Sequence, residues 1–168
     1  MQPSEALSAS AQVAVTLAGF AGVVVAFRSG SVHEWSKLDK FRLQILLLNS
    51  VLPFMLSIFG LFLLATKLNE VTIWRWCSLV AFIGAAITGQ FIGHGFRGLS
   101  RQQLYGSTSR RWIFFSSGVI GAVATLLQLY NVIRLQTFWP FLAVISTWLW
   151  LAIVQFVLLV FAAPDQRA

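Results

Sequence analysis

Five long stretches of this chain contain almost no charged residues, and they dictate what it can fold into. They run over about 6–27, 43–66, 73–94, 112–133 and 138–163. Each is long enough to cross the hydrocarbon layer of a bilayer, which takes about 20 residues as a helix. Lipid offers no water to the backbone, so each crossing segment must pair its own peptide groups as a helix. We therefore predict an all-α fold: one polytopic membrane helix bundle over residues 1–168, with about five transmembrane helices.

The composition agrees with a bundle that faces lipid. Hydrophobic residues make up 58% of the 168 residues and charged residues only 10%. A soluble domain carries about 25% charged residues, because its surface must face water. The length leaves no room for an additional soluble domain. We therefore expect an integral membrane protein whose main contact is the lipid bilayer.

The basic residues indicate an orientation in the membrane. Nine of the 12 fall in the connections after the first and third stretches and at the C-terminus. Cytoplasmic connections carry an excess of Lys and Arg, so we predict that the N-terminus lies outside and the C-terminus inside. The connection after the third stretch contains no acidic residue, and we expect it to meet anionic lipid headgroups. Its basic residues are Arg97, Arg101, Arg110 and Arg111. Basic residues divided among connections do not form the single basic face of a nucleic-acid binder.

The boundary between the last two stretches is short. Only residues 134–137 separate them. Two separate crossings give five spans, whereas a hairpin that never crosses would leave three spans and a re-entrant segment.

A polar stripe follows one face of the first stretch. At 100° per residue it consists of Glu5, Ser8, Gln12 and Thr16 and continues into Gly19. Gln12 and Thr16 lie at or near membrane depth, where an unpaired polar group is costly. Two interpretations are open. The stripe forms hydrogen bonds with another helix, or copies of this helix surround an axis and line a water-filled path, with Glu5 at an outer mouth that favours cations.

Small residues recur at every fourth position in the first and third stretches. Such stripes allow close approach of helix backbones, which is what drives helix association in lipid. We predict helix packing, in a dense bundle that self-associates, through Ala14, Ala18, Gly22, Ala81, Ala85, Gly89 and Gly93.

Groups suited to catalysis do not converge in the apolar stretches. We expect all five acidic residues in tails or loops: Glu5, Glu34, Asp39, Glu70 and Asp165. His33 lies in a loop, His94 lies at the end of a stretch, and Cys77 is the only cysteine. Proton-coupled transport normally uses charged groups within the membrane, and a metal site needs several ligands together. We therefore predict no enzymatic activity, no cofactor and no metal site.

Two segments near the N-terminus resemble known proteins. They are ALSASAQVAVTLAGFAGVVVAF at 6–27 and WSKLDKFRLQILLLNS at 35–50. The pair resembles a group of small, uncharacterised bacterial multi-pass membrane proteins with an LAGF-type first helix and a W…D..RL…LL..S second element. The resemblance covers the first third of the chain and implies the bacterial cytoplasmic (inner) membrane, but no activity. The LAGFA run is also faintly similar to the pore helix of Orai calcium channels.

These observations favour one functional hypothesis and leave a second open. The first is a homo-oligomeric membrane channel or pore for ions or small solutes, lined by the first helix. The second is a non-catalytic accessory or scaffold subunit of a membrane complex, whose stripes only pack against partners.

Overall fold

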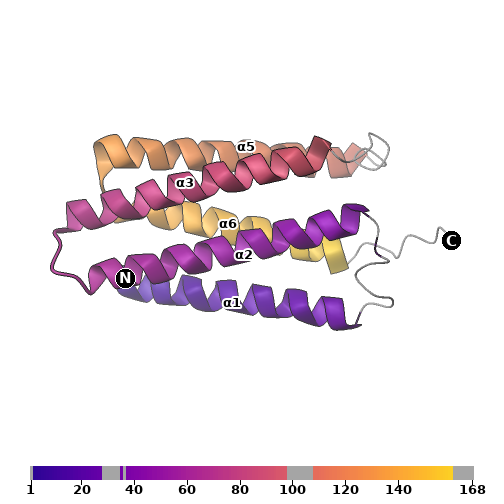
Figure 1. Cartoon of the computed structure of the whole chain (residues 1–168), viewed down its shortest axis with the longest axis horizontal. Coiled ribbons are helices and arrows are strands. Elements are labelled where there is room, and N and C mark those ends of the chain that lie inside the picture. Colours follow the sequence, from indigo (N-terminus) through magenta and orange to yellow (C-terminus); the bar gives the residue numbers. More distant parts are fainter. Residues whose placement is uncertain (1, 28–34, 36, 98–107, 161–168) are drawn as a thin grey trace.

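Five long helices make up the fold. The computed structural model describes residues 2–27, 35, 37–97 and 108–160. The helices are α1 (Pro3–Phe27), α2 (Lys37–Leu64), α3 (Glu70–Arg97), α5 (Thr108–Tyr130), which continues into a π-helical turn η2 (Asn131–Leu135), and α6 (Phe138–Val160). They lie side by side along one direction (Figure 1). The prediction of an all-α bundle of five membrane-spanning helices is confirmed, since all five are long and apolar enough to cross a membrane.

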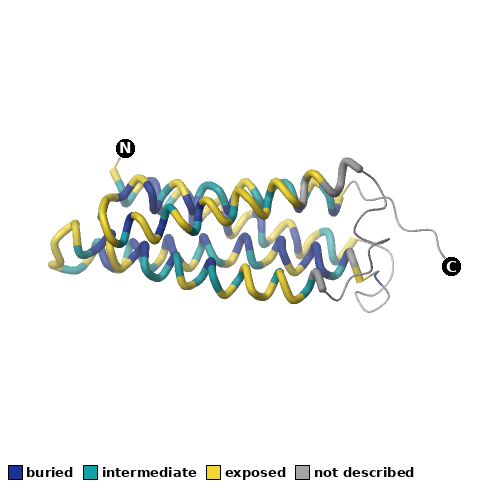
Figure 2. The backbone as a smooth tube through the Cα atoms, turned by 90° about the horizontal axis from the view of Figure 1, so that it is seen from above, coloured by how far each residue is buried: buried dark blue, intermediate teal, exposed yellow. Residues whose placement is uncertain are grey.

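Two helices form the centre of the bundle. α2 and α6 pack against each other, and α1 packs on both of them. On the other side α3 packs on α2, and α5 joins α3 to α6. Figure 1 shows this order, with α1 and α5 at opposite edges. Buried and exposed residues alternate along each helix (Figure 2), because only one side of each helix faces its neighbours.

Four of the five helices begin before their apolar stretches do, and α6 begins with its stretch at Phe138. α2 begins at Lys37 rather than 43, and α5 at Thr108 rather than 112. Asp39 and Glu70 therefore lie in the first turns of helices, and the expectation that they lie in loops was wrong. Glu5 also lies in a first turn, that of α1. A carboxylate is favourable there because the helix N-terminus carries partial positive charge. Glu34, Asp165 and residues 161–163 of the fifth stretch lie outside the described residues.

A buried carboxamide organises the connection between α5 and α6. The side-chain nitrogen of Asn131 donates to Ser78 Oγ on α3 at 2.6 Å and to the Thr137 carbonyl at 3.0 Å. In return, the Thr137 backbone N–H donates to Asn131 Oδ1 at 3.1 Å. Gln136 takes the left-handed conformation, with φ 52°, and its N–H donates to the Asn131 carbonyl at 2.8 Å. This turn lets the chain reverse in very few residues, so that α5 with η2 and α6 are two separate helices, each long and apolar enough to cross a membrane on its own.

The orientation in the membrane is the first testable prediction. The start of α2, the end of α3 and the start of α5 lie at one end of the bundle (Figure 1), and they carry six of the nine basic residues that the structure describes. Cys77 is fully buried, so we expect the parent protein not to react with a thiol reagent in cells, and any label then reports an introduced cysteine. We expect a membrane-impermeant maleimide to label Leu68→Cys on intact cells and Lys37→Cys only after lysis. The reverse pattern would contradict the prediction of N-out and C-in.

Candidate functional site

The polar stripe of α1 lies on the outer surface of the bundle. Glu5, Gln12, Thr16 and Gly19 are exposed, and Ser8 is half-buried. The opposite side of α1 packs against α2 and α6 through Ala6, Leu7, Ser10, Ala11, Ala14, Leu17 and Ala21. At 100° per residue the two sets occupy opposite sides of the helix. The stripe therefore faces away from the side of α1 that packs on α2 and α6.

The members of the stripe differ in how their polar groups are paired. Glu5 Oε2 accepts from the backbone N–H of Gln2 at 3.1 Å, which caps the start of α1. The Thr16 hydroxyl donates to the carbonyl of Gln12 at 2.8 Å. Among the described residues, nothing forms a hydrogen bond with the Gln12 carboxamide. Gln12 lies nine residues after Pro3, roughly 14 Å along the helix axis, so its amide sits at a depth where lipid would surround it.

An unpaired amide at this depth requires a partner from outside the chain. Transfer of an amide from water to an apolar medium without a compensating hydrogen bond costs roughly 2–7 kcal/mol. The side chain of Gln12 can avoid that cost by meeting water, a second copy of the chain or another protein. The exposed face of α1 is therefore the first candidate functional site.

The small-residue stripes divide into a packed part and an open part. Ala14, Ala81 and Ala85 are buried in the core. Ala18 is half-buried. A Cβ added to Gly22, Gly89 or Gly93 would meet no atom within 4 Å. Glycines that closely approach other helices lie elsewhere: a Cβ would come within 2.8 Å of a leucine methyl group at Gly60 and within 2.9 Å of one at Gly84, and it would meet the Phe41 ring at Gly95.

The remaining predicted groups lie at the helix ends. Arg97 ends α3, and Arg110 and Arg111 lie in the first turn of α5, at the same end of the bundle (Figure 1). Arg101 lies outside the described residues. His94 is exposed, with Nδ1 2.8 Å from the Gln90 carbonyl. Within the described part of the chain, no three His, Cys, Asp or Glu side chains come together as metal ligands would.

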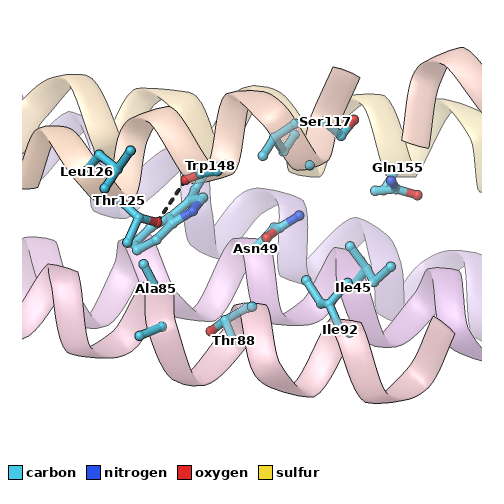
Figure 3. Close-up of a pocket in the computed structure, with 17 residues that line it drawn as sticks. Ile45, Asn49, Ala85, Thr88, Ile92, Ser117, Thr125, Leu126, Trp148 and Gln155 are labelled. Carbon is cyan, nitrogen blue, oxygen red and sulfur yellow. Dashed lines mark hydrogen bonds between the residues drawn. The ribbon is translucent and has the colours of Figure 1, made fainter. Parts of the chain in front are cut away.

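The structure also contains a cavity that was not predicted from the sequence. Its volume is about 580 Å³, and α2, α3, α5 and α6 all contribute to its walls. Figure 3 shows Asn49 and Thr88 on one side of it and Ser117, Thr125, Trp148 and Gln155 on the other. The signals in the sequence were the carboxamide residues Asn49 and Gln155 within two of the apolar stretches. Periodicity alone did not indicate that these two residues face a common space.

No family model, curated protein or solved structure matches this chain, so its function must be inferred from its own residues.

Proposed function

We propose that this integral membrane protein is a homo-oligomeric pore for ions or small solutes. In the proposed assembly, copies of α1 surround a central axis with Gln12 and Thr16 facing it. The observation that carries the proposal is the position of the polar stripe, which points away from the packed side of α1. A ring of such helices would give the Gln12 amide the water that it lacks in lipid.

The order of residues along this face fits a path with distinct sections. Glu5 lies at the start of the helix, where a ring of carboxylates would concentrate cations. Gln12 and Thr16 follow at membrane depth, and Gly19 leaves the axis open. Val23, one turn further, is exposed on the same face and would form an apolar constriction of the kind that gates by dewetting. From the resemblance of its first third, we infer that the protein works in a bacterial cytoplasmic membrane.

The same observation favours a second candidate function. If α1 meets a different protein instead of its own copies, Gln12 would donate to and accept from a helix of that protein. The chain would then be a non-catalytic accessory or scaffold subunit of a membrane complex. Only the pore requires a closed ring and a conducting axis.

Potassium efflux from liposomes containing the purified protein tests the proposal, and native mass spectrometry on the same sample counts the subunits. We expect a ring of four or more subunits that conducts potassium. Replacing Gln12 and Thr16 with leucine removes the polar lining, so flux should fall by more than about tenfold, a barrier change of about 1.4 kcal/mol. The matched control is Val13→Leu, an exposed apolar residue of the same helix, which should leave flux unchanged.

Two results would contradict the pore. One is an unchanged potassium flux in the Gln12→Leu/Thr16→Leu variant that still assembles as the parent does. The other is a monomeric parent protein without flux. If such a monomer co-purifies from native membranes with a second protein, and loses it on the double substitution, the accessory function is supported instead.

A further inference from the structure

We propose that the cavity between α2, α3, α5 and α6 binds a neutral amphiphile. Such a molecule has an apolar body and one uncharged head, a hydroxyl or an amide, that both donates and accepts hydrogen bonds. This site is separate from the proposed pore lining, because α1 contributes no residue to the cavity wall. The two proposals can therefore fail independently.

Two buried carboxamides face the cavity without partners in the chain. Gln155 is 2% exposed, and its Oε1 has no hydrogen-bond partner. Asn49 is 5% exposed, and no described residue forms a hydrogen bond with its side chain. Buried polar groups are nearly always paired, and an exception calls for an explanation. By contrast, both the nitrogen and the oxygen of the Asn131 carboxamide are paired within the same bundle.

The chemistry of the wall selects an uncharged head. None of the residues that line the cavity is charged. A carboxamide offers two N–H donors and a carbonyl acceptor, so Asn49 and Gln155 together match a head that donates and accepts. An anionic or cationic head would bring an unpaired charge into this space, which costs several kcal/mol. The hydroxyls of Thr88 and Ser117 line opposite sides of the same cavity (Figure 3) and can add contacts to the head.

The rest of the wall fits an apolar body. The cavity volume of about 580 Å³ lies within the range of ligand pockets, roughly 300–1,000 Å³. Gly89, Gly93, Gly118 and Gly121 border it, and a Cβ at any of them would meet no atom within 4 Å. Trp148 also lines the cavity, beside Thr125 in Figure 3, and its ring gives a flat apolar surface. Because Gly89, Gly93 and Gly118 are exposed, the gap between α3 and α5 offers an entrance from the lipid side.

Photoaffinity labelling of the full chain in lipid nanodiscs tests this site. The probe is hexadecanol carrying a diazirine on its chain, and mass spectrometry maps the labelled residues. We expect labelling concentrated at the glycine positions of α3 and α5, and competition by unlabelled hexadecanol but not by ionised hexadecanoic acid. Hexanol added from water is a second competitor. If hexanol lowers the labelling as much as hexadecanol does, the site is supported and its ligand comes from water. If hexadecanol competes and hexanol does not, the ligand comes from the bilayer.

Three variants complete the test. Asn49→Leu with Gln155→Leu should lower the competed labelling about tenfold. Gln44→Leu, which replaces an exposed carboxamide on α2, should not change it. Gly121→Leu places a side chain in the open space and should also remove the labelling. We expect the unfolding midpoint of this variant to be at least that of the parent protein. Equal competition by the fatty acid, even labelling of all lipid-facing helices, or full labelling of folded Gly121→Leu would each overturn the proposal.

Discussion

Replacing Asn131 with leucine is expected to lower the free energy of unfolding by about 3 kcal/mol. The side chain is fully buried and connects three parts of the bundle: its own helix end, Ser78 on α3 and the turn residue Thr137. Leucine would leave the Thr137 backbone N–H and carbonyl without their partners. Hydrogen bonds between membrane helices contribute about 0.6 kcal/mol each on average, but a buried group left unpaired costs roughly 1–3 kcal/mol. The second effect dominates here.

Equilibrium unfolding in mixed micelles, with increasing fractions of a denaturing detergent, measures this change. Ser78→Ala removes only the bond to α3 and should cost about 1 kcal/mol. The matched control is Thr147→Ala, because the Thr147 hydroxyl donates only to the Ala143 carbonyl of its own helix, at 2.8 Å. That substitution should stay within about 0.5 kcal/mol of the parent. A stability of Asn131→Leu equal to that of Thr147→Ala would show that the turn does not depend on this network.

Replacing Gly60 with valine is expected to lower the free energy of unfolding by about 2–3 kcal/mol, because overpacking of a well-filled core costs roughly that much. Gly60 lies on α2 where α1, α3 and α6 all approach. A Cβ there would come within 2.8 Å of Leu7 Cδ1, 3.3 Å of Phe141 Cε1 and 3.8 Å of Cys77 Sγ. Leu7 and Phe141 are themselves fully buried. The two methyl groups of valine can therefore be placed only if the tightly packed side chains of Leu7 and Phe141 shift.

Gly118→Val is the matched control for this prediction. Gly118 also lies within a helix, but a Cβ there would meet nothing within 4 Å. The same exchange should therefore change the unfolding free energy by less than about 0.5 kcal/mol, the usual range away from packed sites. Equal losses in Gly60→Val and Gly118→Val would show that close packing at Gly60 does not set the effect, since valine has a higher helix propensity than glycine and should not destabilise the open site.

The sequence was sufficient for the class of the fold and the number of helices. Runs of apolar residues near the length of a bilayer crossing are a local property, and in lipid they have only one way to pair their backbone groups. The short connection at 134–137 was the uncertain point. The conformation of this connection depends on the hydrogen bonds of Asn131, whose partner Ser78 lies 53 residues earlier in the chain.

Other features depended on how the helices pack, which a periodic pattern in one helix does not specify. The stripe through Ala14 and Gly22 did not reveal that α1 packs at Ala14 and is open at Gly22. Nor did the GxxxG pair Gly89 and Gly93 indicate that both border a cavity.

The candidate sites divide in the same way. The sequence alone identified the polar stripe of α1, because residues of one helix share a face by geometry. That this face points away from the bundle was decided by tertiary packing, which placed α2 and α6 on the opposite side. That Asn49 on α2 and Gln155 on α6 line one cavity was likewise decided by tertiary structure. Residues so far apart in the chain meet only through the positions of whole helices, and those positions depend on the fit of many side chains at once.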